Sequence, residues 1–144
     1  MPDTTSQAQY SLGFALAAQL VHGRIGPEHV SGPGLRDTKI AEILPRITIR
    51  EVARHSDRFP LGRWSDVTLT LRDGRLLDSG DVHARGGPEA PMALPEVEAK
   101  FHAMSGALPD RRKAAIWAMR ARLMDPDVRF AELLALLYAP VDQA

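Results

Sequence analysis

The dipeptide Asp73-Gly74 lies between two segments whose pattern is that of β-strands. Residues 67–72, just before it, read VTLTLR, and this alternation of apolar and polar residues is typical of a half-buried strand. A type I′ turn needs positive φ at both central residues, and Asp-Gly is among the dipeptides that adopt it most readily. The sequence therefore predicts a tight hairpin in which a strand over 67–72 pairs antiparallel with a strand from about Arg75 to His83.

The segments on either side of this hairpin mostly have the period of amphipathic helices. One further alternating stretch, Ile47–Arg50, predicts a strand that precedes the hairpin. The predicted helices are Tyr10–His22, Arg36–Leu44, Leu94–Ala107, Asp110–Met124 and Val128–Tyr138. The order α-α-β-β-β-α-α-α predicts an α+β fold, in which helices pack with a small antiparallel sheet of about three strands.

Composition limits both the class of protein and its partners. A chain of 144 residues has the length of one domain, so we expect a single domain over residues 1–144. Lys+Arg and Asp+Glu balance at 18 each, so no net charge draws the chain to nucleic acid or to an anionic membrane. The apolar run Leu12–Val21 is too short to cross a bilayer. No cysteine is present, which excludes disulfides and fits a cytoplasmic protein.

The histidines do not form a metal-ligand pattern. None stands in an H-x-x-x-H or H-E-x-x-H pair, so the sequence predicts no metal site and favours scattered surface or loop histidines. His83 differs from the others, because it ends the predicted third strand just before a glycine-rich loop. Binding residues often lie on loops that a rigid scaffold positions, so His83 is a candidate site residue.

The loop that begins Arg85-Gly86-Gly87-Pro88 connects this strand to the next helix. The two glycines allow the backbone to approach an anion closely, and Arg85 can bind a carboxylate through two parallel hydrogen bonds. The alternative is a connecting loop whose glycines only supply positive φ. Because the loop contains neither G-x-G-x-x-G nor a Walker A sequence, nucleotide binding is not indicated.

The residues by themselves indicate no catalytic constellation. Ser11 stands in no G-x-S-x-G motif and has no evident base partner, so serine hydrolase chemistry is not supported. Residues 111–113 read RRK near the start of a predicted helix, and we expect this basic cluster to be a solvated face.

Four segments of the chain resemble one known family. Residues 85–101 read RGGPEAPMALPEVEAKF and are similar to the signature R-G-x-P-E-N-P-L-S-x-x-E-L-E-x-K-F. Residues 8–17 (AQYSLGFALA), 67–75 (VTLTLRDGR) and 127–137 are similar to an opening helix, a hairpin and a closing helix of the same family. On these motifs the chain resembles the carboxy-terminal domain of the MmgE/PrpD family, which includes 2-methylcitrate dehydratase, cis-aconitate decarboxylase and iminodisuccinate epimerase.

The resemblance implies a role in the chemistry of small carboxylic acids. Members of the family are longer than this chain, and their large helical domain carries most of the catalytic groups, while the smaller domain closes over the substrate as a lid. Their reactions begin with proton abstraction next to a carboxylate and lead to dehydration, decarboxylation or epimerisation. The resemblance implies no metal and no organic cofactor. Since the chain begins about where the lid begins, we expect the helical domain to be absent from it.

Two positions depart from the family pattern. Tyr10 stands where dehydratases and decarboxylases of the family place an active-site histidine, and tyrosine, with an unperturbed pKa of about 10, is a poor base at neutral pH. Its hydroxyl can still donate a hydrogen bond to a carboxylate or a developing enolate, whereas the alternative is that Tyr10 packs at the start of the first helix. Ala93 stands where the family usually has a serine that caps a helix. The resemblance thus implies Tyr10 as a catalytic residue, and we expect Ser11, His83 and Arg85 as substrate-binding residues.

The sequence supports two hypotheses about function. In the first, the chain is the lid-domain part of a lyase or isomerase that acts on small di- or tricarboxylates together with a separate helical MmgE/PrpD subunit. In the second, it is a non-catalytic remnant that serves as an oligomerising or binding module. The apolar first helix and the LLALLY sequence at 133–138 predict surface that needs covering, so we expect a homo-oligomer or a hetero-complex.

Overall fold

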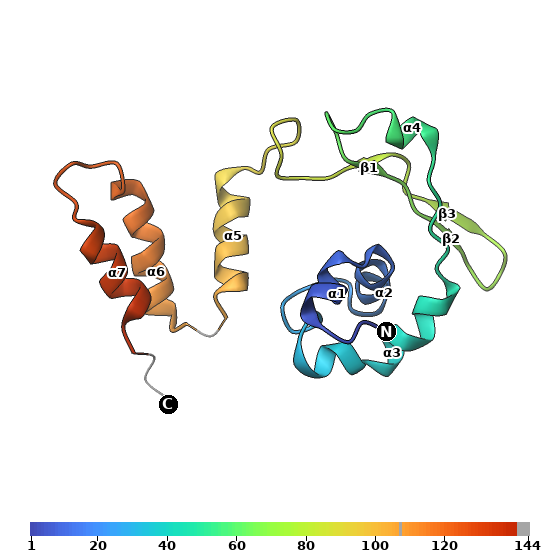
Figure 1. Ribbon diagram of the computed structural model, residues 1–144, viewed down its shortest axis with the longest axis horizontal. Helices are drawn as coiled ribbons and strands as arrows, with labels where there is room; N and C mark the ends of the chain where they lie inside the picture. The colour runs from blue at the N-terminus through green and yellow to red at the C-terminus, as the bar shows by residue number, and fades with distance from the viewer. Residues whose placement is uncertain (107, 141–144) are drawn as a thin grey trace. The chain divides into compact units, whose positions relative to one another are not determined.

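The computed structural model describes residues 1–106 and 108–140 (Figure 1). The chain divides into two compact units, residues 1–91 and residues 92–144, which are described in turn as unit 1 and unit 2. The described residues form seven α-helices and two antiparallel sheets of two strands each, so the predicted α+β class is confirmed. The single domain expected over residues 1–144 stays a prediction.

Unit 1 begins with two consecutive helices, α1 (Thr5–Tyr10) and α2 (Leu12–His22). The helix predicted over Tyr10–His22 is α2, which begins at Leu12, whereas α1 was not predicted. Ser11 leaves the helical conformation and separates the two helices. The Ser11 side chain accepts a hydrogen bond from the backbone N–H of Phe14 at 3.2 Å. Ser11 is therefore the N-cap of α2, a position at which serine is strongly preferred.

The third helix, α3 (Thr38–Ile43), packs against α2 and completes a small helical core. It lies within the helix predicted over Arg36–Leu44, and Asp37 caps its start by accepting hydrogen bonds from two backbone N–H groups of the first turn. The 3₁₀ turns η1 (Gly32–Arg36) and η2 (Leu44–Arg46) flank it. Unit 1 packs around five apolar residues with no exposed surface: Ala8, Phe14, Ala17, Ala18 and Ile40.

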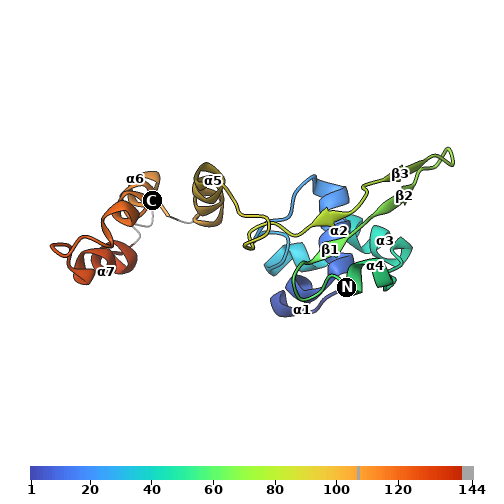
Figure 2. The same cartoon turned by 90° about the horizontal axis from the view of Figure 1, so that it is seen from above.

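A narrow antiparallel ribbon follows the helical core. After the short helix α4 (Ala53–Ser56), β1 (Trp64–Ser65) pairs with β4 (Val82–His83), and β2 (Thr68–Thr70) pairs with β3 (Leu76–Asp78). Figure 2 shows the β2–β3 end projecting away from the helices of unit 1. All three residues of β3 are exposed, as expected for this position, so the ribbon contributes little to the core.

A β-bulge divides the ribbon in two. Residues 79–81 on one edge lie opposite only residues 66–67 on the other, so one edge has an extra residue. Gly80, at φ 62°, adopts the left-handed conformation that the extra residue requires. The bulge splits the strand predicted from Arg75 to His83 into β3 and β4, and Asp81 lies at its end.

The predicted hairpin is confirmed, but its turn is of a different type. The Leu71 N–H donates to the Arg75 carbonyl at 2.8 Å, and the Gly74 N–H donates to the Leu71 carbonyl at 3.0 Å. Gly74 has φ 85°, whereas Asp73 does not have positive φ. The connection is therefore a three-residue loop closed by a left-handed glycine, in place of the predicted type I′ turn. Asp73 instead accepts hydrogen bonds from the backbone and the guanidinium of Arg75.

The strand predicted at Ile47–Arg50 is wrong. Ile47 has an extended backbone, but residues 47–50 pair with no strand in the part of the chain that the structure describes. Ile47 packs against the helical core formed by α1, α2 and α3. Ile47 is thus covered by helices, whereas Ile49 is 61% exposed, so the alternation does not mark a strand.

Unit 2 is a group of helices. It contains α5 (Leu94–Met104), α6 (Asp110–Met119) and α7 (Phe130–Tyr138), with the 3₁₀ turn η3 (Arg120–Arg122) after α6. All three helices were predicted, and the described part of each is shorter than its predicted range. The predicted end of the first of them at Ala107 lies outside the described residues.

The first two helices of unit 2 meet through aromatic side chains. Phe101 of α5 stacks with Trp117 of α6, with ring centroids 5.5 Å apart. The start of α5 keeps half of a capping box, because the Glu96 carboxylate accepts a hydrogen bond from the Ala93 backbone N–H at 2.8 Å. Glu96 thus satisfies one backbone donor at a helix start whose N-cap residue, Ala93, has no side-chain acceptor.

Arg112 fastens α6 to the end of α7. Its Nε donates to the Leu136 carbonyl at 2.6 Å, and its Nη2 donates to the Leu137 carbonyl at 2.7 Å. Carbonyls in the last turn of a helix have no intrahelical partner and carry partial negative charge, which a guanidinium neutralises. The solvated face predicted at residues 111–113 is therefore wrong for Arg112, and the Lys113 side chain is only 12% exposed.

Replacing Phe14 with alanine should lower the free energy of unfolding by about 3–5 kcal/mol, because it removes a fully buried aromatic ring. The matched control is Tyr10→Ala, which removes an aromatic ring that is 92% exposed and should change stability by less than about 0.5 kcal/mol. Urea unfolding followed by circular dichroism measures both variants. Equal losses in the two variants would contradict the location of the core.

Candidate functional site

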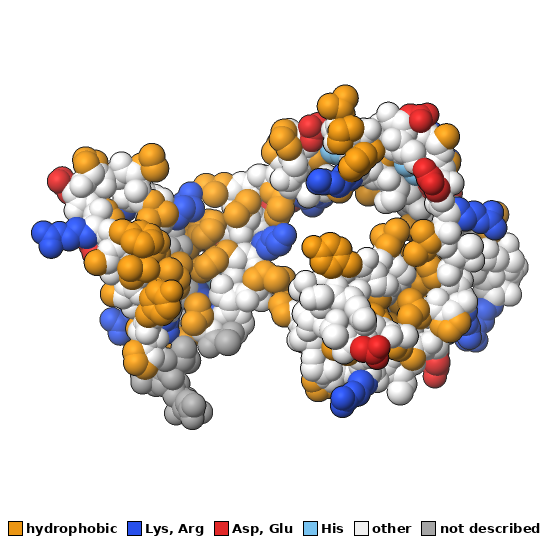
Figure 3. Space-filling view, in the orientation of Figure 1, with side chains coloured by type: hydrophobic (Ala, Val, Ile, Leu, Met, Phe, Trp, Pro, Cys, Tyr) orange, Lys and Arg blue, Asp and Glu red, His pale blue; other side chains and the backbone are white. Residues whose placement is uncertain are grey.

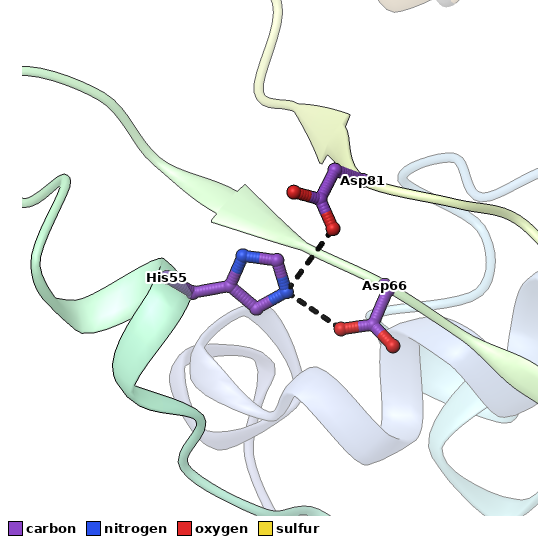
Figure 4. Close-up of side chains that lie close together, drawn as sticks. All are labelled: His55, Asp66 and Asp81. Carbon is purple, nitrogen blue, oxygen red and sulfur yellow. Dashed lines mark hydrogen bonds and ion pairs between the residues drawn. The ribbon is translucent and has the colours of Figure 1, made fainter.

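Three titratable side chains converge between α4 and the ribbon of unit 1 (Figure 4). His55 comes from α4, Asp66 follows β1, and Asp81 precedes β4. The His55 Nε2 lies 2.6 Å from Asp66 Oδ1 and 3.9 Å from Asp81 Oδ1. The bulge supports this geometry, because both aspartates lie in the irregular part of the ribbon between the two strand pairs.

Two arginines complete this cluster, which we call the His55 network: Arg54, His55, Arg58, Asp66 and Asp81. Arg54 Nη2 lies 2.8 Å from Asp66 Oδ1, and Arg54 Nε lies 3.1 Å from Asp81 Oδ1. Arg58 Nη1 lies 2.7 Å from Asp81 Oδ2. The two guanidinium charges balance the two carboxylates, so the network is neutral when His55 is neutral.

The arginines shift the titration of the network. The hydrogen bond from Arg58, followed by that from Arg54, holds the pKa of Asp81 below its usual value. The hydrogen bond to Asp81 in turn raises the pKa of Arg54. Both shifts favour the charged forms, as expected for ion pairs that are also hydrogen-bonded.

The ligand atoms of His55, Asp66 and Asp81 lie within 4.8 Å of one another, a spacing that a metal ion could bridge. However, Oδ1 of each aspartate already accepts a hydrogen bond or ion-pair contact from Arg54. A cation would have to displace that guanidinium and then remain beside two positive charges. The donor set therefore favours an ion-pair network, and we assign no metal to it. His55 Nδ1 is buried and has no hydrogen-bond partner among the described residues.

An open hollow of about 500 Å³ lies beside the network, and we call it the Gly62 hollow. Arg58 belongs to both sites, because its guanidinium carbon lies 4.8 Å from the centroid of the Trp64 ring. The Trp64 and His83 rings are stacked with centroids 4.6 Å apart. The residues that line the hollow are Arg58, Leu61, Gly62, Trp64, His83, Glu89 and Ala90.

Of the four site residues predicted from the sequence, only His83 lines this hollow. Arg85 follows two residues later and is itself engaged in an interaction. Tyr10 and Ser11 lie where α1 meets α2. Tyr10 is 92% exposed, so the alternative that it packs at the start of the helix is wrong. Ser11 caps α2 with its side chain.

Sequence reasoning missed the residues of the His55 network. His55 and its two aspartates are separated by 11 and 26 positions, so no short motif contains them. Their only sequence signal is charge. Two arginines lie near His55, Asp66 precedes one predicted strand, and Asp81 lies within another. Such charges usually lie on solvated faces, and only the fold of the ribbon brings these together.

A comparison with models of protein families shows the family to which the chain belongs. A model of the MmgE/PrpD C-terminal domain matches residues 1–125. The chain belongs to the MmgE/PrpD family. The match covers unit 1 and the first two helices of unit 2, so the resemblance seen in the opening helix, the hairpin and the loop before α5 is confirmed. The similarity at residues 127–137, which include most of α7, lies beyond the match and stays a prediction.

A comparison with curated proteins found no match. No helix in the described part of this MmgE/PrpD domain has both the length and the apolar character of a membrane span.

The Asp81→Asn variant should be less stable than the wild type at pH 7, because it leaves Arg54 and Arg58 without their shared carboxylate. The folded state lowers the pKa of Asp81, so this carboxylate stabilises the protein above its unfolded pKa of about 3.9. That stabilisation is lost as the pH falls through the lower, folded value. In urea unfolding, the free energy of unfolding of the wild type should therefore exceed that of Asp81→Asn, and this difference should shrink as the pH falls from about 4 to about 2.

The matched control for this experiment is Asp57→Asn, which removes an exposed carboxylate next to α4. Its difference from the wild type should be small at every pH. The role of the arginines would be contradicted if the wild type exceeded Asp81→Asn in free energy of unfolding by the same amount at pH 7 and at the acid end of the titration.

Proposed function

We propose that the chain supplies the substrate-covering lid of an MmgE/PrpD-type lyase or isomerase that acts on small di- or tricarboxylates. We further propose that activity requires the family's large helical domain, provided by a separate subunit, and that the protein works in the cytoplasm without metal or organic cofactor. The observation that carries the proposal is the match of the C-terminal domain to residues 1–125. The absence of cysteine fits the reducing compartment.

The described residues support a lid better than a complete active site. Chemistry next to a carboxylate needs a base that is free to take a proton and donors for the developing negative charge. In the His55 network, the Nε2 atom is engaged by Asp66 and the Nδ1 atom is buried, so neither nitrogen is open to a substrate. Domain closure can supply what a lid alone lacks, because it excludes water and completes the catalytic groups.

Tyr10 is proposed as the residue through which the lid takes part in the reaction. Its side chain is 92% exposed on the helical core, so its hydroxyl is open to a substrate held by another domain. A phenol is suited to donating a hydrogen bond to a developing enolate. Arg85, in the loop after β4, is proposed as a carboxylate contact, with His83 and Ser11 as further substrate-binding residues.

The decisive experiment compares the purified chain with the chain co-expressed with an MmgE/PrpD helical domain. We expect no turnover of 2-methylcitrate, cis-aconitate or iminodisuccinate by the chain alone, and turnover of one of them by the complex. In that complex, Tyr10→Phe should lower kcat about 100-fold, because it removes one donor to the developing charge. Turnover by the isolated chain, or an inactive but well-formed complex, would contradict the proposal.

The matched control is Tyr138→Phe, which removes the hydroxyl of the chain's other tyrosine. Tyr138 ends α7 and is also exposed, but no role in substrate binding is proposed for it. Its kcat should equal that of the wild-type complex. Equal losses in the two variants would show that Tyr10 has no specific part in the reaction.

A second candidate function, a non-catalytic oligomerising module, is favoured by the apolar face of α7. Four of its side chains are exposed at the helical spacing i, i+4, i+7 and i+8: Phe130, Leu134, Leu137 and Tyr138. Figure 3 shows hydrophobic side chains gathered over this helix. In the described part of unit 2, Met119 is the only buried residue, so the unit has little core of its own.

If this face mediates association, Leu137→Glu should shift the protein from an oligomer to the monomer in analytical ultracentrifugation at micromolar concentration. The matched control is Ala135→Glu, which places the same charge on an exposed position of α7 outside the apolar stripe. The control should keep the oligomer. A wild-type protein that sediments as a monomer would exclude self-association through this face.

A further inference from the structure

We propose that the Gly62 hollow binds a carboxylate, whose oxygen accepts hydrogen bonds from the ring nitrogens of Trp64 and His83 while Arg58 lies at its edge. This inference rests on the proposed function, because it identifies where the lid contacts a carboxylic acid. The site is separate from Tyr10 and Ser11, neither of which lines the hollow.

Two ring nitrogens converge beside Gly62. A Cβ added to Gly62 would stand 2.6 Å from Trp64 Nε1 and 3.2 Å from His83 Nε2, so both nitrogens lie close to one point. The indole N–H is a donor only, and the imidazole Nε2 is a donor in one of its neutral tautomers and in the cation. Neither nitrogen has a hydrogen-bond partner among the described residues. A ligand that satisfies both must present an acceptor.

Gly62 allows the two rings to lie this close to the backbone. The residue is buried, and any side chain at this position would collide with the Trp64 indole. The stacked Trp64 and His83 rings are in turn held at 4.6 Å, so the two donors are positioned before a ligand arrives. The adjacent Leu61 and Ala90 give the hollow apolar surface, which suits the carbon body of an organic acid better than an inorganic anion.

The charges around the hollow give an anion little net attraction. Arg58 is held in place by Asp81 and by the face of Trp64, so its guanidinium remains at the hollow. Glu89 also lines the hollow, and its carboxylate repels an anion. Binding therefore depends on the paired donors, and removing the Glu89 charge should strengthen it.

The test follows the Trp64 indole N–H directly. In a Trp117→Phe background, Trp64 is the only tryptophan, so one indole resonance appears in a ¹⁵N-labelled NMR spectrum. We expect millimolar succinate to shift this resonance in the full chain, and we expect the neutral isostere succinamide and inorganic phosphate to leave it unchanged. No shift with succinate, or an equal shift with phosphate, would overturn the proposal.

Calorimetry on variants then tests the individual groups. His83→Phe keeps an aromatic ring but removes the donor, and it should weaken succinate binding about tenfold. Gly62→Ala places a Cβ only 2.6 Å from Trp64 Nε1, so the indole must move, and the variant should abolish binding. Glu89→Gln should tighten binding several-fold, and this gain cannot come from a damaged fold. Unchanged affinity in both His83→Phe and Glu89→Gln would overturn the proposal.

The outcomes separate this inference from the proposed function. If the complex with a helical domain is active and His83→Phe leaves its KM and kcat unchanged, the hollow is not a substrate contact although the lid function stands. If succinate binds the chain but no complex turns over any carboxylic acid, the hollow is a carboxylate site and the proposed lid function fails.

Discussion

Arg58 connects the two polar sites of unit 1. Its guanidinium bonds to Asp81 at 2.7 Å and lies over the Trp64 ring, so one side chain serves both the His55 network and the Gly62 hollow. Asp81 can accept this bond because the β-bulge shifts the register of the ribbon by one residue. The ribbon has almost no buried apolar surface, and these polar contacts therefore decide how it is held against α4. The geometry of the hollow follows from them.

The two units differ in how they are stabilised. Unit 1 has a compact helical core around Phe14 and Ile40, whereas the described part of unit 2 buries only Met119. Unit 2 is held instead by the stacking of Phe101 on Trp117 and by the clamp of Arg112 on α7. A helical group with so small a core and an apolar stripe along α7 is suited to packing against another surface. This agrees with a domain that works as one part of a larger assembly.

Short sequence motifs predicted those elements that depend only on residues next to one another in the chain. The Asp73-Gly74 pair predicted the hairpin correctly, because a left-handed glycine is required in either kind of turn. The turn type was wrong, since it depends on which backbone groups of Leu71 and Arg75 pair across the ribbon. The strand at Ile47–Arg50 was wrong for a related reason, because alternation shows that one face is covered but does not show what covers it.

The sequence by itself determined the α+β class, the family and every α-helix except α1 and α4, since each of these depends on periodicity or on a motif read along the chain. The tertiary structure alone decided the His55 network and the Gly62 hollow. Their members come from α4 and the segment after it, from β1, β4 and the irregular centre of the ribbon, and from the loop after β4. Hydrogen bonds and ring contacts act over a few ångströms in space and leave no fixed spacing in sequence. Only the folded ribbon therefore brings Arg58, Trp64 and His83 together.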